Sequence, residues 1–600
     1  MANVIPKREQ IAEKDTWDLT GLFESDELWL SEYEALKNVS EQVAEYSGTL
    51  ADSAEQLLSF LKLEDSISLR LETLHGYANC KADQDTSNSF YQDMRGKAVS
   101  RWVEISSAFA FANPEIMAID EDRLNLFYIA QPELESYRRS LYRIRRRAAH
   151  ILSPAEEKLL AAAGEMADAP DSIASIFRDA DLKFPPVSDS VGEMHQLTSG
   201  SLVPLMESAD RNLRKNAFEA YYCKLEEYKN TIAATLDAQF KQLKFFSGAR
   251  HYNSTIEASL DRTEVPVSVY TNLIEAVHKN MDKMYRYVSL RKKLLGLDEL
   301  HMYDVYTPIV AAADEKISYE KAKETVLEAL AVLGDDYIAT LKEAFEKRWI
   351  DVYENEGKRS GAYCSGASRP HPYVLLNHKD NLNSVLTLAH EMGHAMHSYY
   401  SSKHQPVNTS DYVIFVAEVA STCNEVLLLR HMLKNTEDKK QRAYLINHFL
   451  DGFKGSVYRQ TMFAEFELAM GKMAEEGETL TADALSQKYH ELNKLYFGHE
   501  MISDDGIAME WARIPHFFYN YYVFQYATGF SAAVAIANRI LSLGESAVED
   551  YKRFLSSGGS DDPISLLKIA GVDMGSPEPI NSALELFGEL VDEMERLLAE

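Results

Sequence analysis

The chain has 600 residues, more than one hydrophobic core usually organises, so we expect at least two lobes. It is 46% hydrophobic and 26% charged, the ordinary balance of a soluble globular protein. Its formal net charge of −31 argues against nucleic acid and anionic membrane surfaces as partners, because binding phosphate groups needs clustered Lys and Arg.

The cysteines and the N-terminus bear on the cellular compartment. Four cysteines are scattered without a CxxC pair, which excludes a cysteine-based zinc knuckle and is typical of a reducing compartment. The N-terminal stretch has no apolar segment suited to a signal peptide. No run of about eighteen uncharged apolar residues occurs, so no membrane span is predicted. We therefore expect a cytoplasmic protein.

Helical periodicity dominates the first part of the chain. Between Trp29 and Met117, apolar residues recur every three or four positions, separated by charged residues. The pattern breaks around residues 184–199, where prolines and glycines favour extended segments and turns. We place the boundary between an N-terminal helical lobe, residues 1–190, and a second lobe, residues 191–600, near this break.

A second break, Gly357–Asn377, contains two short β-prone stretches, Gly361–Cys364 and Tyr373–Leu376. A small sheet in an otherwise helical chain favours an edge strand whose backbone could pair with an extended peptide. In that interpretation Gly361 and Tyr363 contact the substrate. A simple structural hairpin explains the pattern equally well.

The next segment, VLTLAHEMGHAMHSYY, predicts an amphipathic helix capped by Asn383 or Ser384. His390 and His394 lie one turn apart on its polar side, in the HExxH arrangement, from which both imidazoles can reach one Zn²⁺ ion. Glu391 lies about 100° further round the helix, where it can take a proton from a metal-bound water. A surface helix with two solvated histidines is the plainer alternative.

A catalytic zinc site needs a third protein ligand and an open position for water. His397 shares the face of the two histidines, but three ligands on successive turns of one helix cannot converge on a tetrahedral ion, so a supporting role suits it better. The next predicted helix, Tyr412–Leu433, carries Glu418 and, two turns further on, Glu425. Glu418 is favoured as the ligand, because it is flanked by apolar residues and would be costly to bury without a cation. Glu425 can orient a histidine, or it is an ordinary exposed carboxylate.

Tyrosines recur at helical spacing in the C-terminal part of the chain, at Tyr519, Tyr522 and Tyr526. This spacing is more often a sign of core packing than of catalysis. A buried phenol nevertheless needs a hydrogen-bond partner, which a substrate cleft can supply.

Several stretches together carry a family resemblance. They are TWDLTGLF, GKRSGAYC, AHEMGHAMHSYY, FVAEVASTCNE, RQTMFAEFE and RIPHFFYNYYVFQYATG, beginning at Thr16, Gly357, Ala389, Phe415, Arg459 and Arg513. With them the chain resembles the oligoendopeptidase F branch of the thimet oligopeptidase family of zinc metallopeptidases. The resemblance implies a mainly α, two-lobed zincin-type fold, with a small β-sheet beside the metal helix and a deep channel for short peptides.

The resemblance also implies roles for single residues. It assigns one zinc ion per chain to His390, His394 and Glu418, and base catalysis to Glu391. A downstream histidine and tyrosines of the family hydrogen-bond the substrate and the developing oxyanion. These map best onto His516, Tyr522 and Tyr526, with Tyr519 and Tyr521 as rivals in register.

The sequence therefore predicts a zinc-dependent endopeptidase that hydrolyses internal bonds of short oligopeptides. Its predicted partners are peptide substrates, and the sequence leaves the oligomeric state open. One alternative is a dipeptidyl carboxypeptidase of similar helical fold, which also carries HEMGH and a downstream Glu. The other is a non-catalytic peptide-binding protein with a relic zinc site.

Overall fold

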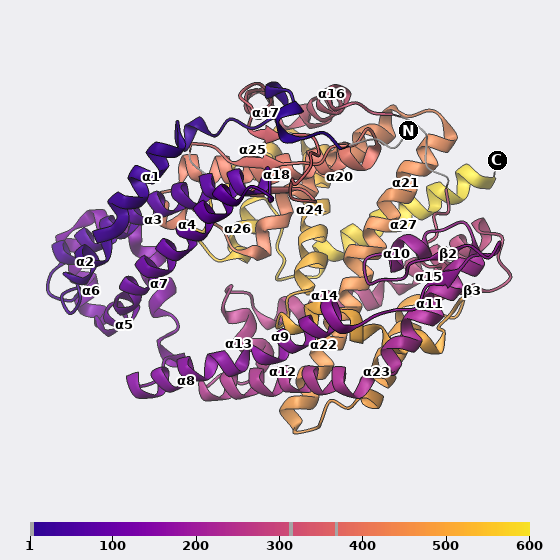
Figure 1. Ribbon diagram of the computed structural model, residues 1–600, viewed down its shortest axis with the longest axis horizontal. Coiled ribbons are helices and arrows are strands. Elements are labelled where there is room, and N and C mark those ends of the chain that lie inside the picture. The colour runs from indigo at the N-terminus through magenta and orange to yellow at the C-terminus, as the bar shows by residue number, and fades with distance from the viewer. Residues whose placement is uncertain (1–4, 311–315, 366–369, 600) are drawn as a thin grey trace. The chain divides into compact units, whose positions relative to one another are not determined.

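The computed structural model describes residues 5–310, 316–365 and 370–599. Helices make up 72% of it and strands 3%, which confirms the mainly α class (Figure 1). No helix within these ranges has both the length and the apolar character needed to cross a membrane.

The chain divides into two compact units, each assembled from three separate stretches. The first unit comprises Met1–Ala148, Asp314–His431 and Ile536–Val572, and the second Ala149–Ala313, Met432–Ala535 and Asp573–Glu600. The continuous lobes expected from composition, 1–190 and 191–600, stay a prediction.

Long N-terminal helices and a short sheet build the first unit. Its elements are α1 (Asp26–Ala35), α2 (Val39–Ala44), α3 (Ala54–Asp83), α4 (Ser89–Ala108), α5 (Ala112–Ala118), α6 (Glu121–Ala130), α7 (Arg138–Arg145), α16 (Tyr319–Leu330), α17 (Asp335–Glu346), β4 (Ile350–Asp351), β5 (Tyr363–Ser365), β6 (Tyr373–Leu375), α18 (Leu382–His404), α19 (Val407–Ser410), α25 (Glu545–Leu555) and α26 (Pro563–Ile569). Helix α20 (Ile414–Asn435) belongs to this unit up to His431.

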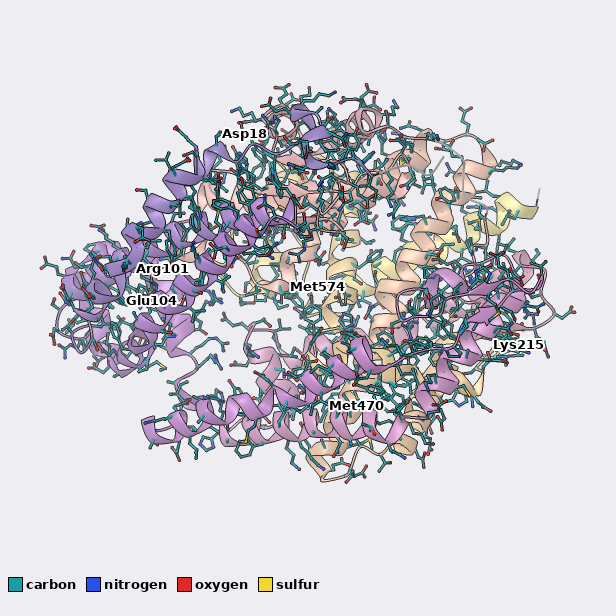
Figure 2. The ribbon with its side chains drawn as sticks, viewed as in Figure 1. Asp18, Arg101, Glu104, Lys215, Met470 and Met574 are labelled. Carbon is teal, nitrogen blue, oxygen red and sulfur yellow. The ribbon has the colours of Figure 1, made fainter. Side chains whose placement is uncertain are left out.

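The core of the first unit joins its N-terminal helices to the sheet. Apolar side chains from Trp17 to Leu141 form one cluster with Tyr373 and Leu375 of β6. Arg101 of α4 is buried, and its guanidinium donates to the half-exposed carboxylate of Glu104 one turn further on (Figure 2). The strand order is β4-β6-β5, with β6 parallel to β4 and antiparallel to β5.

The small sheet lies beside α18, which contacts β5 and β6, so this predicted neighbourhood is confirmed. The cap of α18 differs from the predicted one. Asn381 caps the helix, its side chain accepting a hydrogen bond from the backbone NH of Ser384, whereas the sequence predicts Asn383 or Ser384 as the cap. Asn381 is extended while Asn383 is already helical, and a capping residue must stand outside the helix.

The second unit is again helical. Its elements are α8 (Pro154–Ala167), α9 (Ala169–Ile176), β1 (Val187–Ser188), β2 (Met194–His195), α10 (Leu202–Met206), α11 (Arg211–Glu226), α12 (Lys229–Ala249), α13 (Thr255–Asp261), α14 (Val267–Lys279), α15 (Met281–Leu294), β3 (Leu300–His301), α21 (Lys439–Phe453), α22 (Arg459–Glu476), α23 (Ala482–Phe497), β7 (Met501–Ile502) and α27 (Glu578–Ala599). Two 3₁₀ segments, η12 (Asp505–Arg513) and η13 (Pro515–Phe518), precede α24 (Phe524–Leu543).

Candidate metal centre

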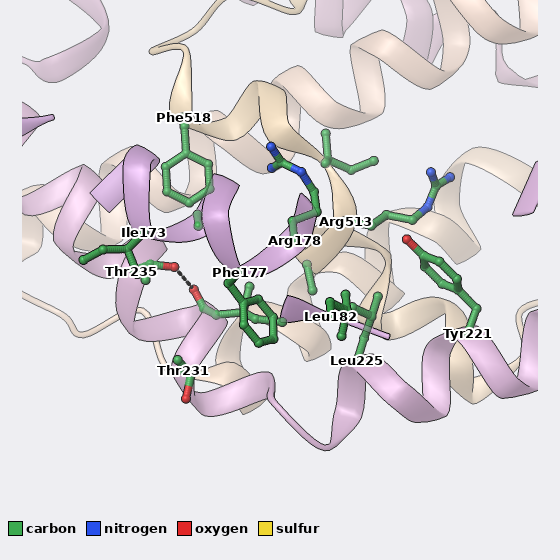
Figure 3. Close-up of a pocket in the computed structure, with 14 residues that line it drawn as sticks. Ile173, Phe177, Arg178, Leu182, Tyr221, Leu225, Thr231, Thr235, Arg513 and Phe518 are labelled. Carbon is green, nitrogen blue, oxygen red and sulfur yellow. Dashed lines mark hydrogen bonds between the residues drawn. The ribbon is translucent and has the colours of Figure 1, made fainter. Parts of the chain in front are cut away.

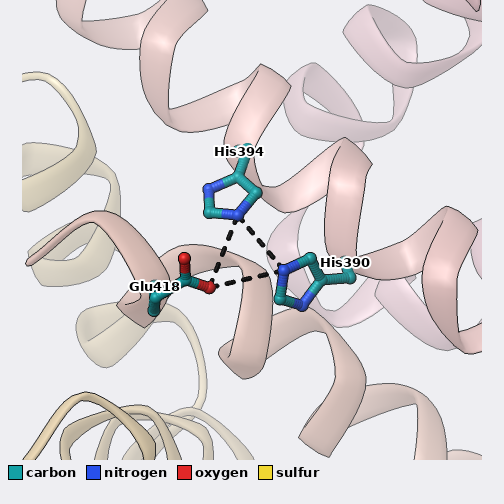
Figure 4. Close-up of side chains that lie close together, drawn as sticks. All are labelled: His390, His394 and Glu418. Carbon is teal, nitrogen blue, oxygen red and sulfur yellow. Dashed lines mark hydrogen bonds and ion pairs between the residues drawn. The ribbon is translucent and has the colours of Figure 1, made fainter. Parts of the chain in front are cut away.

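Three predicted ligands meet where α18 and α20 cross. Nε2 of His390 lies 3.4 Å from Oε2 of Glu418, and Nε2 of His394 lies 3.5 Å from the same oxygen. The two imidazole nitrogens are 3.2 Å apart (Figure 4). Ligands held about 2.0–2.1 Å from a tetrahedral zinc ion are themselves about 3.3–3.4 Å apart. The three atoms therefore have the spacing of one face of a zinc tetrahedron.

A glycine inside the HExxH motif makes this crossing possible. A Cβ atom on Gly393 would lie 2.5 Å from Cα of Ser421 and 2.7 Å from the carbonyl oxygen of Ala420. The backbones of α18 and α20 thus touch at a point between the two histidines and close to Glu418. The buried Asn424 side chain supports the contact by donating to the Ala389 carbonyl, at 3.1 Å.

Glu425 lies on the far side of His390 from Glu418. Its carboxylate accepts a hydrogen bond at Nδ1 of His390, which leaves Nε2 facing the ligand cluster. Burial lowers the pKa of His390, but hydrogen bonds to Glu418 and Glu425 outweigh it and raise the pKa to about 10. A metal ion at Nε2 would have to displace that proton.

Glu391 is buried next to the ligands, with 6% of its surface exposed. Within the described part of the chain, its Oε2 has no hydrogen-bond partner. Burial raises the pKa of this carboxyl group, and the neighbouring His390 and His394 act in the opposite direction. A buried carboxylate oxygen without a protein partner, beside the three candidate ligands, is what a water-activating base requires.

His397 lies deeper in the protein than the ligands. Its ring stacks on Tyr412, with centroids 3.7 Å apart, and lies 5.2 Å from the ring of Phe554. Burial lowers the pKa of His397 to about 3, so the imidazole is neutral. The structure thus places His397 on the buried side of α18, where its imidazole packs against Tyr412 and Phe554.

The predicted substrate strand, β5, is an edge strand. It pairs with β6 on one side, with Tyr363 opposite Leu375. The Tyr363 phenol donates to Asp83, at 2.9 Å, so its side chain is turned into the N-terminal core. Gly361 has a φ of 87°, and its carbonyl accepts from the Asn377 side chain at 2.8 Å. Peptide binding at β5 would therefore use backbone groups of the strand.

A cavity of about 380 Å³ lies between β5 and α18. Cys364 and Ser365 of β5 line one side of it, and Ser398 of α18 and Tyr412 line another. Ser68 and Glu72 of α3 and Trp102 of α4 also line it. Ser398 follows His394 by one helical turn, so it lies on the face of α18 that carries the metal ligands. The size of the cavity suits a peptide side chain.

The predicted His and Tyr residues form a separate group in the second unit. Nε2 of His516 lies 3.4 Å from the Tyr526 phenol oxygen, and its ring centroid is 5.5 Å from Tyr519 and 6.3 Å from Tyr522. Burial lowers the pKa of His516, as does Arg178 nearby. Tyr521 is only 2% exposed and bonds Thr255 instead, so it points away from this group.

The chain between Tyr519 and Val523 is not helical, although its tyrosines have helical spacing. Asn520 and Tyr521 have φ values of 54° and 61°, in the left-handed region, and α24 begins only at Phe524. Tyr519 and Tyr522 approach His516 through this tight turn. The periodicity of the tyrosines could not reveal it, because three-residue spacing fits both a helix and a turn.

A small apolar pocket lies behind the same segment (Figure 3). Phe518 and Ile514 line it together with Phe177, Leu182 and Leu225 from earlier in the chain. The space that it offers to water molecules is about 30 Å³, enough for one or two of them.

One other group in the described residues has metal-ligand spacing: Asp189, Glu193 and His195 of the β1–β2 hairpin. Asp189 already accepts hydrogen bonds from the backbone NH groups of Val191 and Glu193 and contacts His195 at 3.2 Å. These bonds close the turn, so the hairpin accounts for the cluster without an ion.

Comparison with known proteins gives consistent matches. The pattern of Peptidase family M3 matches residues 204–586, and that of Oligopeptidase F matches residues 115–184. Oligopeptidase PepF of Bacillus subtilis is 48% identical over 597 residues, covering 100% of this chain and 89% of the relative. An oligoendopeptidase F homolog of Lactococcus lactis is 42% identical, with 98% of each chain covered.

Solved structures agree with these matches. The oligoendopeptidase-F structure from Enterococcus faecium is 38% identical, with a TM-score of 0.75 and coverage of 96% of this chain and 99% of that chain. A peptidase structure from Chlamydophila abortus is 36% identical, with a TM-score of 0.93 and coverage of 99% and 100%.

Proposed function

This chain belongs to peptidase family M3, and we propose that within it the chain binds one Zn²⁺ ion through His390, His394 and Glu418. Its family membership makes it a metalloendopeptidase that hydrolyses oligopeptides. The identity of the metal, its ligands and the roles of the residues around it are our proposal. The observation that carries it is the 3.2–3.5 Å spacing of the three ligand atoms.

When bound, zinc supplies a Lewis acid that polarises the scissile carbonyl and makes water a better acid. Glu391 takes the proton from the attacking water with its unpaired oxygen and returns it to the leaving amine. Glu425 holds Nδ1 of His390, so that Nε2 keeps its orientation. The backbone edge of β5 aligns the peptide, one of whose side chains enters the adjoining cavity.

His516, Tyr522 and Tyr526 complete the proposed mechanism by donating hydrogen bonds to the substrate and to the oxygen that becomes negatively charged. A neutral His516 suits this role because it can donate from one nitrogen. Tyr519 is proposed to contact the peptide. Each such donor could stabilise the transition state by about 3 kcal/mol.

Glu391→Gln tests the central assignment. We expect the variant to contain as much zinc as the wild type and to lose at least about 1000-fold in kcat on an internally quenched peptide with a blocked C-terminus. Metal content is measured by mass spectrometry of the purified protein. Cleavage of that blocked peptide by the wild type also separates the endopeptidase from a dipeptidyl carboxypeptidase.

The ligands have a matched control on the same helix. His394→Gln should abolish both zinc binding and activity, whereas His404→Gln, at the exposed end of α18, should change neither. An active Glu391→Gln protein, or full zinc content in His394→Gln, contradicts the assignment.

A cytoplasmic location is also part of the proposal. All four cysteines are free thiols, as expected for a reducing compartment. Fractionation of the source cells, followed by immunoblotting, checks it, and recovery of the protein outside the cytoplasm contradicts it.

A further inference from the structure

Helix α22 touches the segment that carries His516 at both of that segment's ends. The helix begins with the stretch RQTMFAEFE, which contains none of the proposed ligands or substrate-binding groups. Two of its ionisable side chains, Arg459 and Glu467, contact opposite ends of the segment 510–521. Both contacts lie within the second unit.

The first contact is a buried ion cluster. Glu510, 1% exposed, accepts hydrogen bonds from Arg459 of α22 and from Arg513, both at 2.6 Å. The Tyr489 phenol donates to its other oxygen. Burial raises the pKa of Glu510, but the two arginines outweigh it and hold the pKa at about 2, so the group is charged. This fixes the chain three residues before His516.

The second contact holds the left-handed turn that follows His516. Glu467 is completely buried, and one of its oxygens accepts the backbone NH of Tyr521. A non-glycine residue with positive φ costs free energy and persists only where neighbours hold it. Two such residues, Asn520 and Tyr521, follow each other here. Gln239 adds bonds to the Phe518 carbonyl and the Asn520 side chain, at 3.1 and 2.9 Å.

Gly471, one turn beyond Glu467 on α22, makes room for the Tyr521 ring. A Cβ atom there would lie 1.8 Å from the Tyr521 phenol oxygen. That oxygen bonds Thr255 Oγ1 at 2.8 Å, so the ring cannot turn aside without losing its partner. Glu467 therefore bonds the backbone of Tyr521, and Gly471 lies against the ring of the same residue, from one face of α22.

We propose that Glu467 and Gly471 are positioning residues that set the turn at 520–521 and thereby bring Tyr519 and Tyr522 to His516. If Tyr521 lost these contacts, the turn at 520–521 could relax to an ordinary helical or extended conformation. Tyr519 and Tyr522 would then no longer lie next to the His516 imidazole. The inference rests on the proposed function of His516 and the tyrosines.

Variants of Glu467 test it, because its carboxyl group has a close mimic. Burial raises the pKa of Glu467 to about 8, so the group is protonated at neutral pH, and Gln matches its shape and its carbonyl acceptor. Glu467→Met keeps the length but offers no acceptor for the Tyr521 NH. We expect kcat/KM of Glu467→Met to fall about 100-fold and that of Glu467→Gln to stay within about 3-fold of the wild type.

Controls separate positioning from a general loss of stability. Val591→Ala, in the buried face of α27, should lower the Tm without a comparable loss of activity. Zinc content should be unchanged in every variant. In Glu467→Met, removing the Tyr522 hydroxyl with Tyr522→Phe should cost little more, because the phenol is already displaced. Should Glu467→Met not fold, Gln239→Met loosens the same turn more mildly and should lower kcat/KM about 10-fold.

Two results would overturn the proposal. One is a folded, zinc-loaded Glu467→Met protein with wild-type kinetic constants. The other is that Val591→Ala, with the same Tm as Glu467→Met, loses as much activity as Glu467→Met does. Failure of the underlying function looks different: His516→Ala and Tyr522→Phe would then themselves be fully active.

Discussion

At the scale of single residues, the metal centre depends on groups that do not touch the metal. Glu425 reaches His390 through one hydrogen bond to Nδ1, and that bond selects Nε2 as the free nitrogen. The carboxylate also makes the imidazole a stronger donor to a cation. Glu425 should contribute more to the affinity for zinc than to the stability of the fold, because its side chain is partly exposed.

Glu425→Gln is therefore expected to weaken zinc binding about 10-fold while changing the Tm of the metal-free protein little. Competition with a chromophoric chelator measures the affinity. Glu437→Gln removes the same charge from an exposed position just beyond α20 and should leave the affinity unchanged. Equal affinities for all three proteins would show that Glu425 is an ordinary surface carboxylate.

The sequence is most informative about residues whose geometry is local. His390 and His394 follow from the four-residue period of one helix, and Glu391 from its position between them. Glu418 required an argument about burial cost and a family resemblance, because it comes from another helix. The proposed roles of Glu467 and Gly471 could not be predicted, since neither the burial of Glu467 nor the left-handed turn at 520–521 leaves a pattern in the sequence.

At the scale of elements, the decisive feature is the close crossing of α18 and α20. Only a residue without a side chain fits at position 393, where the helices are in backbone contact. Helices that cross through ordinary side chains are about 8–10 Å apart, and the backbone contact at Gly393 brings α20 closer, with Glu418 within 3.5 Å of both imidazoles. The HExxH spacing predicts the two histidines, but the depth of the crossing depends on Gly393 and could not be read from periodicity.

Gly393→Ala should therefore disturb the arrangement of the zinc ligands more than it disturbs helix α18 itself. The methyl group would force α18 and α20 apart at a cost of about 1–3 kcal/mol and withdraw Glu418 from the histidines. We expect a lower Tm and loss of most of the zinc, measured by thermal unfolding and metal analysis. Gly96→Ala in α4, where nothing lies within 4 Å, should instead be neutral or slightly stabilising. A zinc-loaded Gly393→Ala protein would refute this account of the crossing.

At the scale of the whole molecule, the units are discontinuous in sequence. In the first unit, the backbone NH of Val352 donates to the carbonyl of Asp15 at 3.0 Å, and that of Asp18 donates to Arg348 at 2.8 Å. Asp351 of β4 is fully buried between Arg8 and Lys358. The N-terminal residues are thus part of the sheet region beside the metal helix. Composition along the chain could not show this, because a break in periodicity marks the end of an element and not the partner it packs against.

A fragment of residues 191–600 tests this organisation directly. It contains every proposed metal and substrate-binding residue, yet it lacks the helices that cover Tyr373 and Leu375 and the arginine that pairs with Asp351. In the fragment Asp351 keeps Lys358 but loses Arg8. Loss of one partner of a buried charge and exposure of an apolar face together cost several kcal/mol, comparable to the whole stability of a domain. We expect the fragment to aggregate or to lack zinc, and co-expression of residues 1–190 to restore both solubility and metal content, measured by size-exclusion chromatography and metal analysis. A monomeric, zinc-loaded fragment 191–600 would show instead that the second lobe is a domain in its own right.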